Sequence, residues 1–420
     1  ALHFIFYIIT GLLYVTGFSL LFRRLNHQQG KPVADKWLIV AFAAKVMAGI
    51  AYGYIYAHIF EVSDSWVYFE ESLIEYHQLL THPSVFFSTG IHFNNAGDLF
   101  SAADDASWSN AGENLLIKLL AVFNVFSAGN YYINVIFFNA LSFWGLYRLY
   151  LVAKKHIQKN NLLIFSTVFF LPSCLFWNSG IDKDGLILFF TGVLIYAVYH
   201  CIAVKLIMRQ LAVCVISFMF IFLLRNVNAL ILLPAIAAWW IAVKYPVRSY
   251  LPFLIIYSVA ILCFFFSVYL SPAFNLPLKL AEKQHQFLNL QANTVLPLTP
   301  LQPTLKSYVA ILPQAVNHVF LRPYVTELKS PFHIMAFGEV LLIMLVFLLA
   351  VVSAGRQMLQ QIAQPFYLFL IMVALSGLLL IGYTVPFPGA IVRYKALYIV
   401  FLLIPFIALL KRVKNKKSIN

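Results

Sequence analysis

The sequence predicts an all-α protein that crosses a membrane many times. Of its 420 residues, 62% are hydrophobic and 10% are charged, and the mean hydropathy is +0.84. Average soluble domains are about 25% charged, so this composition indicates an integral membrane protein. Long apolar segments follow one another along the whole chain, and short basic or polar links separate them. This alternation is typical of membrane-spanning helices.

The length of the apolar segments supports their assignment as spans. A helix needs about 20 largely apolar residues to cross the hydrocarbon core. We therefore predict about 11 transmembrane helices in a single membrane domain over residues 1–420. The first span lacks the basic flank and the cleavage site of a signal peptide, so we expect it to be retained. The predicted spans lie near 2–22, 37–58, 130–152, 161–178, 186–204, 210–224, 229–243, 250–271, 333–354, 365–383 and 396–410.

The basic residues predict how the chain is oriented. Alternating spans from an outer N-terminus put the links 23–36 and 153–160 and the tail 411–420 in the cytoplasm, as the positive-inside rule favours. The C-terminus is then cytoplasmic, and two long loops, 59–129 and 272–332, are extracytoplasmic. The net charge of +14 comes mostly from basic residues in short loops between spans. Topology and the anionic lipid headgroups beside these loops explain such residues, so the charge does not indicate nucleic-acid binding.

The first outer loop is acidic. No Lys or Arg occurs between Lys45 and Lys118, and nine of the fifteen carboxylates of the chain lie there. Apolar and acidic residues alternate over 65–80, which predicts an amphipathic helix lying on the bilayer. Residues 81–112 are rich in Ser, Asn, Ala, Gly and Asp and are expected to be irregular, and 114–126 predicts a second amphipathic helix.

The second outer loop has two parts. The first, 272–303, holds five of the eighteen prolines of the chain. The second predicts a helix over 306–320. No internal repeat is evident in the sequence.

Asp64 is the predicted catalytic base. It lies about six residues after the second span, at the boundary between membrane and water, where a carboxylate can take a proton from an acceptor hydroxyl. Trp66 and Tyr68 are aromatic residues typical of this boundary. Glu70 and Glu71 are the nearest competitors as acid/base or acceptor-orienting groups. A solvated loop carboxylate is the alternative explanation for each of the three.

A second acidic site is predicted in the short link 179–185 between two spans. This link contains Asp182, Lys183 and Asp184 beside ordinary turn-forming residues. Ionisable residues at the membrane edge usually pair with one another or serve a site. Asp182 and Asp184 are therefore candidate acid/base or acceptor-orienting groups, and Lys183 is a candidate phosphate ligand.

A third group is cationic, and the predicted topology places it on the outer side. It consists of Arg225, Arg322, Arg393 and Lys395. Guanidinium groups bind phosphate in a bidentate manner and stay charged at any working pH. Three arginines from separate loops could converge on the phosphate of a lipid-linked donor. The alternative is that each one pairs with a neighbour such as Glu327, or extends to the lipid headgroups.

Metal and nucleotide chemistry receive little support. The four cysteines lie in apolar segments without metal-ligand spacing and are explained as packing residues. The histidines show no HExxH pattern, so no metal site is predicted, although Asp98, Asp104 and Asp105 leave a divalent cation open. No P-loop or GxGxxG motif occurs, which argues against an ATP-driven mechanism.

Several of these segments together resemble the GT-C superfamily of integral membrane glycosyltransferases, which includes protein O-mannosyltransferases and lipid A aminoarabinose transferases. The shared features are an acidic first outer loop opening with Ser63-Asp64-Ser-Trp-Val-Tyr68, amphipathic interfacial helices and a polar turn between short spans. The segments Phe-Trp-Asn-Ser-Gly-Ile-Asp182, Leu-Arg322-Pro-Tyr and Ala-Ile-Val-Arg393-Tyr are also similar to membrane proteins encoded with bacterial surface-polysaccharide genes.

The resemblance implies a GT-C-like fold and an activity. The enzyme would be a hexosyl- or pentosyltransferase, inverting and independent of nucleotides, on the outer face of a bacterial inner membrane. Asp64 would be the base, and the basic residues would bind the phosphate of a polyprenyl-phosphate-linked sugar. The acceptor would be a glycan, a lipid or a protein of the envelope.

Two other functions stay open. A repeat-unit polysaccharide polymerase, acting on pyrophosphate-linked oligosaccharides, would use outer arginines in the same way. A transporter or flippase of lipid-linked sugars belongs to another class, for which repeat symmetry and broken helices at the membrane midplane are expected.

Overall fold

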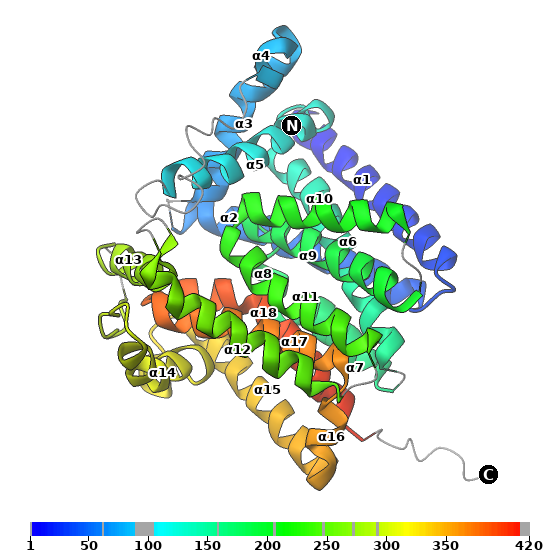
Figure 1. Ribbon diagram of the computed structural model, residues 1–420. Helices are drawn as coiled ribbons and strands as arrows, with labels where there is room; N and C mark the ends of the chain where they lie inside the picture. Colours follow the sequence, from blue (N-terminus) through cyan, green and yellow to red (C-terminus); the bar gives the residue numbers. More distant parts are fainter. Residues whose placement is uncertain are drawn as a thin grey trace, which may run out of the picture.

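The chain folds into α-helices, whose arrangement is shown by a computed structural model (Figure 1). Nine helices in the described part of the chain are long and apolar enough to cross a membrane. No β-strand occurs in that part. The predicted class, a multi-pass all-α membrane protein, is therefore confirmed. The structure describes residues 2–60, 63–88, 105–157, 159–204, 207–245, 248–270, 274–290 and 294–411.

The long apolar helices form the body of the molecule, and shorter helices lie between them. α9 continues into a π-helical turn and α12 into a 3₁₀ turn. The nine long helices are α1 (Leu2–Gln28), α2 (Asp35–His58), α6 (Tyr131–His156), α9 (Lys183–Tyr199), α11 (Asn226–Lys244), α12 (Tyr250–Phe266), α15 (Pro331–Ala354), α17 (Pro365–Thr384) and α18 (Pro388–Leu409). The other helices are α3 (Asp64–Thr81), α4 (Pro83–Ser88), α5 (Asp105–Ser127), α7 (Asn161–Phe170), α8 (Pro172–Trp177), α10 (Met208–Leu224), α13 (Leu276–Leu288), α14 (Leu305–Phe320) and α16 (Met358–Ile362).

Two of the predicted spans are short. α10 has 17 residues, and the span expected over 161–178 divides into α7 and α8. Pro172 explains this division, because proline has no N–H for the helical hydrogen bond and forces the preceding residue out of the helical region. Leu171 is accordingly extended, with φ −62° and ψ 121°. The total of eleven spans stays a prediction.

The last span begins earlier than the sequence analysis expected. An outer link over 384–395 was predicted before a span at 396–410, but α18 begins at Pro388. Proline suits the first position of a helix, because its fixed φ is helical and its missing N–H needs no partner there. Arg393 and Lys395 therefore lie in the first turns of a long helix. The prediction of a loop at this position was wrong.

The first outer loop holds more helix than expected. α3 confirms the helix predicted over 65–80. α5 includes the helix predicted over 114–126 but already begins at Asp105. α4 forms a short helix within 81–112, a segment that was expected to be irregular. Residues 89–104, with Asp98 and Asp104, lie outside the described residues.

The second outer loop contains one helix that was predicted and one that was not. α14 confirms the helix expected over 306–320. α13 lies in the proline-rich part. Its first turn is capped by Asn275, whose Oδ1 accepts a hydrogen bond of 3.0 Å from the backbone N–H of Leu278.

The core is built around α6, which lies near the centre of Figure 1 beside α9. The two helices approach so closely that a Cβ atom on Gly192 would lie 2.0 Å from the carbonyl oxygen of Gly145. Small residues at such a contact let two helix backbones meet, which is a common basis of helix association in membranes. This close contact fixes α9, whose first turn carries two of the predicted site residues.

Several shorter helices lie toward the edges of the molecule, whereas α7, α8 and α10 pack against the long helices. In Figure 1, α3 and α4 lie at the top and α13 and α14 at the left, whereas α16 lies at the bottom. The predicted site residues come from the beginnings of α3, α9, α11 and α18 and from the link after α14.

Candidate functional site

The polar turn between α8 and α9 is held from two sides. Lys45 in α2 donates hydrogen bonds from Nζ to the carbonyl oxygen of Asn178, at 2.9 Å, and to Ser179 Oγ, at 3.1 Å. Asn139 in α6 donates to the carbonyl oxygen of Ser179 at 2.8 Å. A Cβ atom on Gly49 would lie only 2.5 Å from that oxygen. The turn therefore sits tightly against α2 and α6, which fixes the two aspartates that follow it.

These two aspartates form a buried ion-pair network with two arginines. The carboxylate of Asp184 accepts a hydrogen bond from Arg393 Nε at 2.8 Å and pairs with Arg225 at 2.9 Å. Asp182 accepts a hydrogen bond from the second terminal nitrogen of Arg393. The side chain of Asp182 is 1% exposed and that of Asp184 is 9% exposed. Three segments that are distant in the sequence therefore meet near the beginning of α18.

Asp64 lies at the open side of this network. One oxygen of its carboxylate is 3.8 Å from a terminal nitrogen of Arg393, while its side chain is 64% exposed. Its neighbours anchor the start of α3: the Ser65 hydroxyl lies 2.6 Å from the hydroxyl of Tyr131, and Trp66 Nε1 donates to the carbonyl oxygen of Gly53 at 2.9 Å. Asp64 is thus fixed in position and still accessible. We call Asp64, Asp182, Asp184, Arg225 and Arg393 the ion-pair cluster.

The charges of the ion-pair cluster do not fully balance, since three carboxylates face two guanidinium groups. Burial raises the pKa of Asp182 above its ordinary value, against the opposing effect of Arg393. Its Oδ1 is buried and has no hydrogen-bond partner among the described residues. Burial disfavours the charged form of Arg225, but Asp184, Tyr394 and Asp182 together outweigh it, so the pKa of Arg225 is raised. Both arginines are already engaged by carboxylates, which leaves them few donors for a further anion.

The other predicted acidic and lysine residues are placed outside the ion-pair cluster. Lys183 forms an ion pair of 2.9 Å with Glu113 of α5. Glu70 and Glu71 are exposed on α3. Lys395 is 2% exposed and donates to the carbonyl oxygen of Val319 at 3.2 Å. This bond fastens the last turn of α14 to α18.

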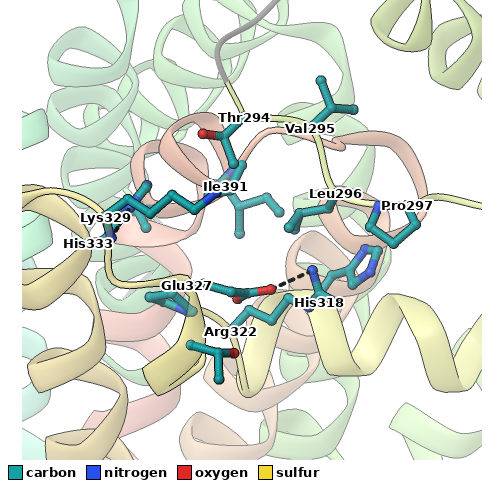
Figure 2. A pocket seen from close by; sticks show the side chains of 14 residues that line it. Thr294, Val295, Leu296, Pro297, His318, Arg322, Glu327, Lys329, His333 and Ile391 are labelled. Carbon is teal, nitrogen blue, oxygen red and sulfur yellow. Dashed lines mark hydrogen bonds and ion pairs between the residues drawn. The ribbon is translucent and has the colours of Figure 1, made fainter.

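Arg322 belongs to a different part of the site, a cavity of about 280 Å³. Figure 2 shows Lys329 and His333 at one side of this cavity, with Arg322, Glu327 and His318 around the rest. Arg322 pairs with Glu327 at 3.0 Å. Among the described residues that line the cavity, Arg322 and Lys329 face a single carboxylate, so this lining is net positive even with both histidines neutral. We call it the cationic pocket.

Two nitrogen atoms in the cationic pocket lack partners. His318 is 1% exposed, yet its Nδ1 has no hydrogen-bond partner in the part of the chain that the structure describes. The same holds for Nε of Arg322. Burial and the charge of Arg322 together lower the pKa of His318. Buried polar atoms are normally hydrogen-bonded, so two unpartnered nitrogens on residues that line one cavity make it a candidate site for a ligand with acceptor oxygens.

The beginning of α18 joins the two parts of the site. Pro388, Ile391 and Val392 line the cationic pocket, and the next residue, Arg393, belongs to the ion-pair cluster. The first backbone N–H groups of a helix have no intrahelical partners and favour a negative charge nearby. A ligand in the cationic pocket would therefore lie beside both the helix start and the ion-pair cluster.

Sequence reasoning found the cluster residues but missed several others. Lys45 in α2 holds the turn before α9, and Glu113 in α5 pairs with Lys183 at the start of α9. His318, Lys329 and His333 line the cationic pocket. An ionisable residue inside an apolar span is itself a signal of a functional or structural role, and Lys45 is such a residue.

No group of three or more His, Cys, Asp or Glu residues that could hold a metal ion occurs within the described residues. Comparisons with protein-family models, with curated proteins and with solved structures find no match to this chain.

Proposed function

We propose that this protein is an integral membrane glycosyltransferase that moves a sugar from a polyprenyl-phosphate donor to a hydroxyl of an envelope glycan, lipid or protein. One observation carries the proposal. An accessible carboxylate, Asp64, is held beside the partly buried guanidinium of Arg393, and Val392, the residue before Arg393, lines a cationic pocket whose lining residues carry unpartnered nitrogens. A base and a phosphate site placed side by side are what transfer from a lipid phosphate requires.

In the proposed reaction, Asp64 takes the proton of the acceptor hydroxyl. The acceptor oxygen then forms a bond to the anomeric carbon of the donor sugar. The bond between that carbon and the phosphate oxygen breaks, and its electron pair leaves with the polyprenyl phosphate. Attack from the side opposite the leaving group inverts the configuration at the anomeric carbon. No nucleotide or metal is required by these steps.

We assign the lipid phosphate to the cationic pocket. Arg225 and Arg393 are engaged by Asp184 and Asp182. Arg322 pairs with one carboxylate, Glu327, and its Nε keeps no partner among the described residues, so it is the better placed of the three arginines to receive another anion. The unpartnered Nε of Arg322 and Nδ1 of His318 would supply hydrogen bonds to phosphate oxygens. Donors placed where negative charge develops stabilise the leaving phosphate as the bond breaks.

We also propose a working face. Asp64 of the ion-pair cluster lies at the start of α3, in the loop that the positive-inside rule predicts to be extracytoplasmic. A bacterial inner membrane is the setting in which polyprenyl-phosphate sugars meet envelope acceptors. Anionic membrane lipids would surround the basic side of the protein.

A reconstituted assay with a panel of donors tests the function. We expect purified protein in liposomes to move label from a polyprenyl-phosphate monosaccharide to an envelope acceptor, without added nucleotide or metal. Use of pyrophosphate-linked oligosaccharides alone would replace this proposal with the polymerase. Translocation of the lipid-linked sugar, with its linkage intact, would replace it with the transporter.

Donor binding is also expected to depend on pH through His318. In the free protein, burial and the charge of Arg322 lower the pKa of this imidazole. A bound phosphate stabilises its protonated form, so binding takes up a proton and the Kd falls as the pH falls. The dependence is at most about tenfold per pH unit for one proton. It is measured by titrating a fluorescent polyprenyl phosphodiester, whose own charge is constant between about pH 5 and pH 8.

Variants identify the group that titrates. His318→Gln is expected to remove the pH dependence, whereas His333→Gln, which changes another imidazole of the cationic pocket, is expected to retain it. A pH dependence that disappears in His333→Gln and persists in His318→Gln would contradict the assignment.

A further inference from the structure

A second cavity lies at the opposite end of α18. It has a volume of about 570 Å³ and is lined by the end of α18, the end of α15 with the turn before α16 and α16 itself, and the link before α7. Figure 1 shows α16 at the lower edge of the molecule, away from α3 and α14. The polar residues that line this cavity are Lys159, Ser353, Arg356, Gln357, Gln361 and Lys411.

The charged side chains among the described residues that line this cavity are all positive. Three of its lining residues, Lys159, Arg356 and Lys411, are cationic, and no carboxylate occurs among the described residues that line it. The three cations come from three separate segments of the chain. Like charges repel, so three cations around one cavity favour an anion between them.

Two hydrogen bonds on one side and the glycine that ends α15 on the other shape the walls of the cavity. Asn160, next to Lys159, donates from Nδ2 to the carbonyl oxygens of Leu410, at 2.7 Å, and of Ile407, at 3.2 Å. The link before α7 is thereby fastened to the end of α18. On the other side, Gly355 has φ +53° and ends α15, which suits glycine because it lacks a Cβ atom.

Apolar side chains stand exposed beside the cations. Val352 is 70% exposed and Leu348 61% exposed on the last turns of α15, and Leu359 is 80% exposed on α16. In a membrane protein, such side chains face lipid acyl chains. A ligand that fits this surface therefore combines a negative group with hydrocarbon.

We propose that this cavity binds the headgroup of an anionic phospholipid, with the phosphate between Lys159, Arg356 and Lys411 and the acyl chains along α15 and α16. Basic pockets between spans are a recognised way for membrane proteins to hold such headgroups. The amide groups of Gln357 and Gln361 add hydrogen-bond donors to the same cavity. The inference does not depend on the proposed glycosyl transfer, since it concerns the other end of α18.

Native mass spectrometry of the full chain in detergent tests this proposal. We expect phosphatidylglycerol to bind more tightly than phosphatidylcholine. The triple variant Lys159→Gln, Arg356→Gln, Lys411→Gln is expected to weaken phosphatidylglycerol binding on the order of 100-fold, since each cation near the headgroup contributes about fivefold. The matched control changes three exposed basic residues outside the cavity, as Arg24→Gln, Lys36→Gln, Lys155→Gln, and is expected to change binding by less than about threefold.

Other outcomes would overturn it. Equal binding of phosphatidylglycerol by the cavity variant and the wild type would do so, as would an equal loss in the control variant. Displacement of the lipid by equimolar inorganic phosphate would show that the cavity takes a free anion instead. If the triple variant does not fold, the single variant Arg356→Gln is used, because Arg356 is exposed, and a loss of less than about threefold would then count against the proposal.

Discussion

Replacement of Asp64 by Asn is expected to abolish sugar transfer while leaving the protein folded. The amide keeps the size of the carboxylate but cannot take the proton of the acceptor hydroxyl. Loss of a general base reduces the rate by about 10²- to 10⁴-fold. The side chain of Asp64 is 64% exposed and lies 3.8 Å from Arg393, so its contribution to stability is small. The measurement is kcat of the reconstituted enzyme, beside its thermal unfolding temperature.

A matched control separates the role of Asp64 from the loss of a negative charge near the membrane. Glu70 is also an exposed carboxylate of α3, and Glu70→Gln makes the same chemical change. We expect this variant to retain most of the activity. If Glu70→Gln removed transfer and Asp64→Asn did not, the assignment of the base would be wrong. A raised KM with unchanged kcat in Asp64→Asn would make Asp64 an acceptor-binding residue instead.

The helices were predictable from the sequence because their signals are local. Apolar length predicts α2, α6 and α17, and the alternation of apolar and acidic residues predicts α3. The start of α18 was not predictable in this way. Its first turn contains Pro388 and Gly389, which are typical of turns, and only the position of the proline at the first helical residue makes it part of the helix.

The composition of the candidate site was predictable in part, but its geometry was not. Asp64, Asp182, Asp184, Arg225 and Arg393 were singled out because ionisable residues at a membrane edge usually pair or serve a site. These residues meet only because positions about 200 residues apart in the sequence are in contact, such as Arg393 and Asp184. From the sequence alone, Arg322 is expected beside the other two arginines, whereas in the structure it lines a separate cavity.

The cationic pocket illustrates a second limit. His318 lies in an amphipathic helix, Lys329 in a short polar link and His333 at the start of the span predicted over 333–354, with no motif spacing among them. A histidine or lysine in such a segment is usually just solvated, so nothing in the sequence distinguishes these residues. Only the tertiary arrangement buries His318 to 1% exposure and leaves its Nδ1 without a partner among the described residues.

Replacement of Arg393 by Met is expected to destabilise the protein by about 3–5 kcal/mol, which is typical when one partner of a buried ion pair is removed. The side chain length is similar, but Asp182 loses its partner and Asp184 keeps only Arg225. The effect is measured as the free energy of unfolding in detergent. Arg24→Met is the control, since Arg24 is exposed on α1, and it is expected to change stability by less than about 0.5 kcal/mol.

The same variant has a characteristic pH dependence. Burial already raises the pKa of Asp182, while Arg393 opposes that rise. Without Arg393, the pKa of Asp182 in the folded state increases further above the value of the unfolded chain. The folded state then binds a proton that the unfolded state releases, so stability is present at low pH and is lost as the pH rises through the folded pKa.

We therefore expect the loss in Arg393→Met to be smaller at about pH 5 than at about pH 8, and Asp182→Asn to restore part of it at the higher pH. The double variant removes both the charge and its partner, so the energies of the two single changes should not add. A loss that is the same at both pH values and additive with Asp182→Asn would mean that Arg393 acts through packing alone. Asp182 and Asp184 would then be held by the turn and by Arg225, and the accessible carboxylate of Asp64 would not depend on Arg393 for its position.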